Sequence, residues 1–321
     1  MTITDTYTSE FWPTATTEAT VPFREGFTWY RVSGDLSSGM TPLVVLHGGP
    51  GCTHDYLLRL AALSDAKWGS RPVIHYDQIG NGRSSHHPQK GVDFWTPQLF
   101  LAELDNLLEH LKIADSYDLL GQSWGGMLAA EHAVLRPAGL NRLVIADSPA
   151  SMPLWLAAAA ELRAALPTGV NDTLLAHEAA GTTASSEYVA AVQVFNDRHV
   201  CRVVPNPPEV AASMAAIDLD PTVYQTMNGP SEFHVVGSLK DWSVVDRLPQ
   251  ISVPTLVISG YYDEATPATV QPYLDQIPDA RPWVFAESAH LPHVEETESY
   301  LRVVASFLTG ELMPTVVAVA E

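Results

Sequence analysis

Short apolar runs alternate with longer stretches of helical spacing along much of the chain. Residues 41–47 (TPLVVLH), 117–121 (YDLLG) and 141–147 (NRLVIAD) are apolar runs of strand length. Residues 97–113, before the second of these runs, and residues 125–136, between the second and the third, carry apolar side chains at the spacing of a helix. Buried strands that alternate with helices predict a mostly parallel sheet with helices on both faces.

The pattern changes between residues 149 and 238. This segment is rich in alanine, reads as helical and contains no clear buried strand. The alternation then resumes, with predicted strands over 253–260 and 281–287 and helices after each of them. We therefore expect one α/β core, formed by residues 1–148 and 239–321, with residues 149–238 inserted as a helical cap.

Composition and charge limit the kinds of molecule that this protein is expected to bind. The 321 residues carry a formal net charge of −20, which disfavours binding to nucleic acid and to anionic membranes. The two cysteines, Cys52 and Cys201, are far apart and predict neither a disulfide framework nor a zinc site. The first 23 residues lack a basic region followed by an apolar stretch, so we expect a cytoplasmic protein without a membrane span. Its oligomeric state stays open.

Residues 121–125, Gly-Gln-Ser-Trp-Gly, lie between a predicted strand and a predicted helix. A G-x-S-x-G sequence in that setting is typical of the sharp turn that exposes a nucleophilic serine above the sheet of an α/β-hydrolase. Glycines are needed there because the serine backbone is strained and neighbouring chains approach closely. The pattern predicts Ser123 as a nucleophile.

A nucleophilic serine needs a base and an acid that orients the base. In this fold the acid and then the histidine follow the serine, each just beyond the end of a strand. Asp263 and Glu264 follow the strand over 253–260, and His290 follows the strand over 281–287. Asp147 is a weaker rival for the acid. A rival for the base, His293, follows a proline and is expected to begin the last helix.

The glycine-rich segment His47–Gly51 follows another predicted strand. Hydrolases of this fold take one oxyanion donor from this loop and the other from the amide after the nucleophile. We predict the amides of Gly49 and Trp124 as these donors, with His47 in a structural role. No phosphate-binding loop or metal-ligand spacing occurs elsewhere, so no metal and no cofactor are expected.

Taken together, these motifs resemble the proline iminopeptidase family of α/β-hydrolases, which includes related aminopeptidases and L-amino acid amidases. The resemblance covers nearly the whole chain. It is carried by HGGPG at 47–51, DQIGNGRS at 77–84, GQSWGG at 121–126, MNGPSEF at 227–233, GYYDEATP at 260–267 and SAHLPHVEE at 288–296.

The resemblance implies Asp263 as the orienting acid, and a cap over the site. It also implies that Glu232, in the GPSEF motif, and Glu264 bind the free α-amino group of the substrate. Many members that prefer proline have glycine where this chain has Gln122. Small amino acid amides are therefore expected as substrates besides prolyl compounds.

The predicted function is a serine hydrolase that cleaves an amide or peptide bond after an N-terminal amino acid with a free amine, through an acyl-enzyme. The substrate is then a small molecule or a short peptide. One alternative is an esterase or lactonase for neutral substrates. Another is a non-catalytic ligand receptor on the same fold, since fold alone does not determine function.

Overall fold

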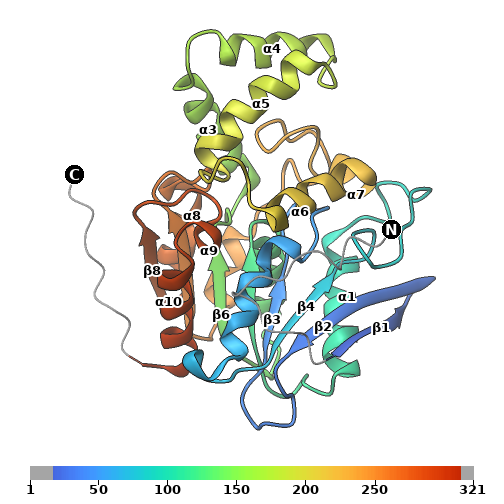
Figure 1. Ribbon diagram of the computed structural model, residues 1–321, viewed down its shortest axis with the longest axis vertical. Helices are drawn as coiled ribbons and strands as arrows, with labels where there is room; N and C mark the ends of the chain where they lie inside the picture. Colours follow the sequence, from blue (N-terminus) through green and yellow to red (C-terminus); the bar gives the residue numbers. More distant parts are fainter. Residues whose placement is uncertain (1–16, 312–321) are drawn as a thin grey trace.

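The computed structural model describes residues 17–311, and its centre is an eight-stranded sheet in the order β1-β2-β4-β3-β5-β6-β7-β8 (Figure 1). The strands are β1 (Thr17–Phe23), β2 (Gly26–Ser33), β3 (Leu43–Leu46), β4 (Val73–Asp77), β5 (Tyr117–Gln122), β6 (Leu140–Ala146), β7 (Thr255–Gly260) and β8 (Ala280–Phe285). β2 pairs antiparallel with β1 and with β4, and the pairs from β4 to β8 are parallel. The predicted mostly parallel sheet is confirmed.

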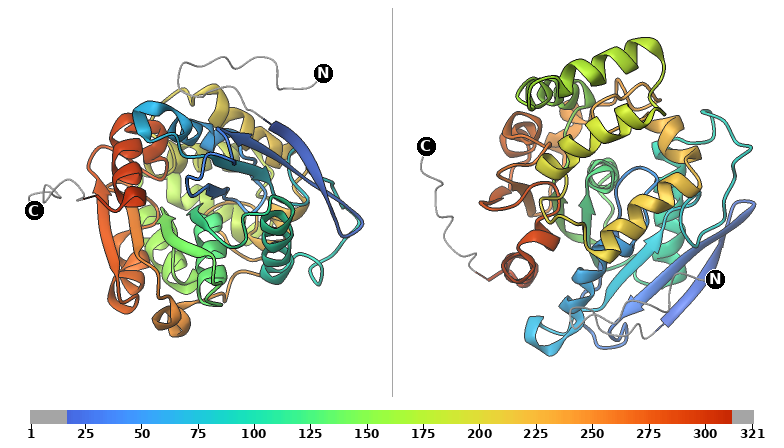
Figure 2. Two further views of the ribbon diagram at one scale, coloured as in Figure 1. Left: turned by 90° about the horizontal axis from the view of Figure 1, so that it is seen from below. Right: turned by 45° about the horizontal axis from the view of Figure 1, so that its top comes forward.

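Helices cover both faces of the sheet, as Figure 2 shows from below. The α-helices are α1 (Pro97–His110), α2 (Trp124–Ala133), α3 (Met152–Ala164), α4 (Val170–Ala180), α5 (Ser186–His199), α6 (Pro208–Leu219), α7 (Thr222–Met227), α8 (Pro267–Gln276), α9 (Pro292–Glu295) and α10 (Thr297–Thr309). Three 3-10 helices are described: η2 (Asp55–Ser64), η3 (Ala66–Trp68) and η4 (Val245–Gln250).

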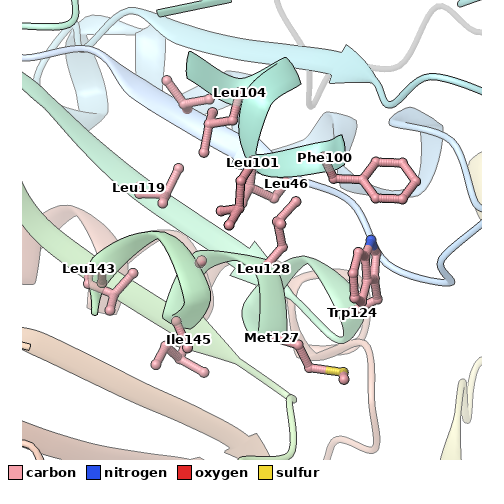
Figure 3. Close-up of a cluster of buried hydrophobic side chains, with 14 of the residues drawn as sticks. Leu46, Phe100, Leu101, Leu104, Leu119, Trp124, Met127, Leu128, Leu143 and Ile145 are labelled. Carbon is pink, nitrogen blue, oxygen red and sulfur yellow. The ribbon is translucent and has the colours of Figure 1, made fainter. Parts of the chain in front are cut away.

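Side chains alternate between the two faces of each strand. In β3, Val44 and Leu46 pack in the cluster that includes α1, α2 and α8, whereas Leu43 and Val45 pack in the cluster that includes η2 and α10. Figure 3 shows the first cluster, where side chains of α1 meet Leu128 of α2. All four β3 side chains are buried, which explains why this strand is a continuous apolar run rather than an alternating one.

The segment between β6 and η4 is helical and lies beyond the carboxyl ends of the parallel strands (Figure 1). It has a small apolar core of its own, which includes Leu174, Phe195 and Phe233. The two ends of the segment meet: Ser151 and Ser243 form an isolated antiparallel bridge, and the Met152 amide donates to the Trp242 carbonyl. The cap boundaries at 149 and 238 stay a prediction.

Several elements differ from the predictions. β1 was not predicted, because it is an edge strand with mostly exposed side chains. α4 was also not predicted, since Leu174 is its one buried side chain. The helix expected to reach Arg136 ends at Ala133, and Arg136 has a φ of +58° directly before a proline. β8 is an edge strand with mostly exposed or partly buried side chains rather than a buried one.

At the chain's carboxyl end, His293 lies in the short helix α9, which is separate from α10. The expectation of a missing secretory signal rests mainly on residues 1–16, and these, like residues 312–321, lie outside the described part of the chain. Over residues 17–311, none of the helices combines the length and the apolar character that a membrane crossing requires.

Candidate active site

Ser123 lies in a strained turn between β5 and α2. Its backbone has a φ of +56° and a ψ of −125°, values that non-glycine residues rarely adopt. The surrounding hydrogen bonds hold this geometry, because the Ser123 amide donates to the Ala146 carbonyl (2.9 Å) and the Ser123 carbonyl accepts from the Gly126 amide (2.8 Å). The serine is therefore held at the carboxyl end of the sheet, beside the end of β6.

The glycines of this turn are required by close backbone contacts. A Cβ atom at Gly121 would lie 2.0 Å from the Gly125 carbonyl oxygen, and one at Gly125 would lie 2.1 Å from the Leu46 carbonyl oxygen. Neither distance is compatible with a side chain, and backbone atoms cannot move aside cheaply. The G-x-S-x-G pattern thus has a steric cause here.

Asp263 follows β7, His290 follows β8, and their side chains are joined. The His290 Nδ1–H donates to Asp263 Oδ1 over 2.7 Å, and the Ala265 amide donates to the same oxygen over 2.8 Å. Both side chains are buried. Because Nδ1 is bound to Asp263, Nε2 is the ring nitrogen that faces away from the carboxylate. Across residues 17–311 no hydrogen bond joins Ser123 to His290, a contact that in related chemistry tightens when substrate binds.

In the glycine-rich loop after β3, the amides of Gly48 and Gly49 differ in whether they have an acceptor. The Gly48 amide donates to the Tyr56 hydroxyl oxygen over 2.7 Å and is therefore occupied. The amides of Gly49 and Trp124 donate to no described residue. Gly49 has a φ of +108°, and a Cβ atom there would lie 2.3 Å from the Gly51 nitrogen, so glycine is required at this position.

His47 and His293, two other histidines near the site, have structural partners. His47 Nδ1 donates to the Gly48 carbonyl, its Nε2 accepts from the Gln78 amide, and burial lowers its pKa to about 4. His293 Nε2 donates to the Tyr56 carbonyl, and burial lowers its pKa to about 3. Both rings are therefore neutral near neutral pH, and neither contacts Asp263 by a hydrogen bond.

Asp147, the rival acid, follows β6 and is fully buried at a φ of +51°. Burial first, and then the negative charge of Asp263, raises its pKa well above the usual range. Neither of its carboxyl oxygens accepts a hydrogen bond from a described donor. Unlike Asp263, Asp147 makes no hydrogen bond to the ring of His290.

Glu232 and Glu264 form a pair of acidic side chains at the site. Glu264 is 1% exposed, and its Oε1 lies 3.8 Å from Nε2 of His290. Burial, followed by the charges of Glu232 and Asp263, raises the pKa of Glu264 well above its usual range. Both Glu264 carboxylate oxygens lack a hydrogen-bond partner among the described residues, so the acidic pair has unused acceptor capacity.

Glu232 comes from the helical segment and has one partner. Its Oε1 accepts from the Tyr224 hydroxyl over 2.7 Å. Burial raises the pKa of Glu232, while the Tyr224 hydrogen bond and the charge of His290 oppose that rise. Its backbone carbonyl accepts from Trp155 Nε1 over 2.7 Å, and the Trp155 ring meets the His290 ring edge to face at 5.9 Å. The helical segment therefore contacts the base directly.

A narrow pocket lies beside Ser123. Its wall contains the two candidate oxyanion residues and Glu232, with a mostly apolar remainder. The lining residues are Gly49, Pro50, Ser123, Trp124, Met127, Pro149, Met152, Trp155, Asn228, Glu232 and Leu239. Glu232 is thus the one carboxylate among these lining residues, and Glu264 is not one of them.

Comparison with known proteins assigns the family. The alpha/beta hydrolase fold profile matches residues 41–297. A proline iminopeptidase of Heyndrickxia coagulans is 37% identical over 294 residues, which are 90% of this chain and 99% of the relative. The chain belongs to the proline iminopeptidase family of α/β-hydrolases. A further family member, the proline iminopeptidase of Saccharolobus solfataricus, is 36% identical over 87% of each chain.

Solved structures agree with membership of the proline iminopeptidase family. The crystal structure of VinJ is 57% identical with a TM-score of 0.91, over 93% of this chain and all of that one (100%). The crystal structure of a proline iminopeptidase from Mycobacterium smegmatis is 52% identical with a TM-score of 0.85, over 92% of this chain and 98% of that one. An enol-lactonase from Burkholderia xenovorans, 21% identical with a TM-score of 0.65, shows the shared fold alone.

Some residues around the family site were not predicted. Tyr224 and Asn228 lie just before or within the MNGPSEF motif, so their proximity to Glu232 in sequence was an available signal. Trp155 carried no signal, because an aromatic residue in an alanine-rich helix is usually a core residue. Tyr56 lies eight residues beyond Gly48 in an apolar stretch and also looked like core.

Proposed function

We propose that this protein is a serine hydrolase that removes an N-terminal amino acid with a free α-amine, by cleaving the amide or peptide bond that follows it. The observation that supports this most strongly is the acidic pair: Glu264 Oε1 lies 3.8 Å from Nε2 of His290, and the charge of Glu232 acts on Glu264. Relatives named proline iminopeptidases point to the same chemistry. The proposed reaction uses no cofactor.

In the proposed mechanism Ser123 attacks the substrate carbonyl carbon. His290 Nε2 accepts the hydroxyl proton and then donates it to the leaving amine, while Asp263 holds the ring and stabilises its protonated form. The amides of Gly49 and Trp124 bind the oxygen that becomes negative in the tetrahedral intermediate. Water, activated by the same histidine, then hydrolyses the acyl-enzyme and releases the free amino acid.

The acidic pair selects for the amine. A substrate ammonium group has three donors, and Glu264 offers two oxygens without partners. Like charges repel at close range, and a buried charge without a partner is costly. An ammonium group between the two carboxylates removes both costs, and it leaves the adjacent carbonyl carbon close to the base.

We further propose that the helical cap, residues 149–238, limits substrate size. Trp155, Met152 and Glu232 of this segment line the cavity beside Ser123. Met152→Ala enlarges that wall and should change selectivity among amino acid amides more than the rate on a small ester. An equal change for all substrates would contradict a selective role.

One comparison tests the function directly. L-alaninamide and L-prolinamide are assayed against their N-acetyl derivatives on the wild-type enzyme, with a neutral p-nitrophenyl ester as a third substrate. The proposal requires that acetylation abolish useful turnover. Equal rates would instead favour the esterase alternative, and absence of turnover on all of them would favour a receptor.

A further inference from the structure

A chain of buried hydrogen bonds connects the oxyanion loop to the backbone of His290. The Gly48 amide donates to the Tyr56 hydroxyl oxygen over 2.7 Å, and the Tyr56 hydroxyl donates to Gln122 Oε1 over 2.5 Å. Gln122 Nε2 then donates to the His290 carbonyl over 3.0 Å. Tyr56 and Gln122 are 2% and 1% exposed, so water does not compete for these bonds.

The direction of each bond follows from the groups themselves. The carbonyl of His290 can accept but not donate, so the Gln122 amide must present its nitrogen there and its oxygen to Tyr56. The single hydroxyl hydrogen of Tyr56 then points to Gln122, which leaves the hydroxyl oxygen to accept from Gly48. Every polar group in the chain is satisfied in one arrangement, and a buried network of this kind resists distortion.

The packing around the chain leaves little space for adjustment. A Cβ atom at Gly48 would lie 2.9 Å from the Tyr56 hydroxyl oxygen, 3.0 Å from Ser123 Cβ and 3.1 Å from Gln122 Oε1. The Tyr56 hydroxyl, the Gln122 side chain and Ser123 Cβ are therefore all close to Gly48. Gln122 is also its immediate neighbour in sequence, as the last residue of β5.

The proposed reaction needs three parts in register: the nucleophile, the base and the oxyanion amides. His290 is held at its ring by Asp263 and at its carbonyl by Gln122. The Gly48 amide is turned toward Tyr56, which leaves the next amide of the loop, that of Gly49, without a described acceptor. The hydrogen-bonded chain thus spans the two parts that must lie on either side of the substrate carbonyl.

We propose that Gln122 and Tyr56 are positioning residues, which set the distance between the oxyanion loop and His290 without touching the reacting atoms. This inference rests on the proposed function for its reaction. Small displacements of catalytic groups reduce rates strongly, and about 1 Å can cost on the order of a hundredfold. The expected signature is a loss of kcat with KM nearly unchanged.

The test compares Gln122→Met and Tyr56→Phe, which keep shape but remove the links, with the exposed controls Gln271→Met and Tyr261→Phe. Gln122→Met and Tyr56→Phe should each lower kcat by about 10-fold to 100-fold on both L-alaninamide and a neutral p-nitrophenyl ester. The double variant should lose little more than the worse single variant, because either change breaks the same chain. Unchanged kcat, or fully additive losses in folded protein, would overturn the proposal.

Gln122→Glu adds a readout that a purely structural role would not move. A carboxylate cannot donate to the His290 carbonyl, whereas a protonated carboxyl group can. The ratio of variant to wild-type kcat should therefore rise as the pH is lowered, and a flat ratio would count against positioning. The ester distinguishes failure of the two proposals. If the wild type turns over the ester but not free-amine amides, the proposed function is wrong. The positioning role of Gln122 and Tyr56 is then still tested on the ester.

Discussion

The two halves of the site differ in how completely their polar groups are satisfied. In the half that would carry out the reaction, the His290 ring donates to Asp263 Oδ1, which also accepts from a backbone amide, whereas the buried Asp263 Oδ2 has no described partner. In the half that would recognise the amine, both oxygens of Glu264 lack partners and Glu232 has one, from Tyr224. The ring of His290 is therefore oriented by its partner, whereas Glu264 keeps both oxygens without one.

The cost of leaving the second half incomplete is visible in its electrostatics. Burial and the neighbouring negative charges raise the pKa of Glu264 well above its usual range. Few proteins keep two facing carboxyl groups buried without a cation, since the desolvation cost is large. The proposed function places amine binding and bond cleavage on separate residues, so mutations should affect them separately.

The largest expected effect lies in the reacting half. Ser123→Ala should lower kcat by about 10³-fold to 10⁶-fold, because the acyl-enzyme cannot form. The variant should still fold, as checked by circular dichroism, since the serine side chain makes no described hydrogen bond. A serine-directed organophosphonate should label Ser123 in the wild type. Near-normal turnover by the alanine variant would contradict the assignment.

The next effect lies in the recognising half. Glu264→Gln and Glu232→Gln should each lower kcat/KM for L-alaninamide by about 30-fold to several thousand-fold, which is the usual cost of about 2–5 kcal/mol for removing one partner of a buried charge pair. Rates on a neutral p-nitrophenyl ester should change little. Glu287→Gln, at an exposed glutamate, is the matched control. Equal losses on amide and ester would show that the two halves are not separable.

The third effect concerns the direction in which folding stability changes with pH. The folded pKa of Glu264 lies above the ordinary 4.5, so between these values the folded protein binds one more proton than the unfolded chain. Wild-type stability therefore falls as the pH rises through this window. Glu264→Gln removes this fall and should raise Tm at alkaline pH by on the order of a few degrees, with little change in acid. Thermal melts over a pH series measure it, and a lower Tm for the variant in alkaline solution would refute the sign.

The smallest effect is expected at the buried acid Asp147, and Asp263 provides the contrast. Asp147→Asn should lower kcat by less than about tenfold, because Asp147 makes no hydrogen bond to His290 and its raised pKa favours the neutral form that the amide resembles. Asp263→Asn should cost far more, on the order of 10⁴-fold, since the wrong tautomer of the histidine is then favoured. If the two variants lose activity equally, Asp147 shares the orienting role.

Much of the reacting half could be predicted because it follows from topology. Ser123, Asp263 and His290 each follow a parallel strand, and the carboxyl ends of such strands meet at one edge of the sheet. The glycines of the serine turn carry a steric requirement that is readable in sequence. The predicted positions follow from local rules, and their catalytic roles stay predictions.

The rest depends on contacts between distant segments. Tyr56 and Gln122 are 66 positions apart, and no periodicity records that their side chains meet. Trp155 reaches His290 from a helix whose sequence resembles ordinary core. Glu232 and Glu264 were named by family resemblance, because a carboxylate on a helical insertion is by default a solvated one. Such pairings are decided by packing, which a single sequence does not display.

The bridge between Ser151 and Ser243 has a consequence for engineering. The helical segment leaves the core and returns to it at neighbouring backbone positions, so its two ends are joined at the surface of the core. Exchanging the segment between relatives would require two adjacent junctions and would leave the β-strand order and the serine turn unchanged. Under the proposed role of the cap, such an exchange would alter substrate range and leave the candidate nucleophile and base in place.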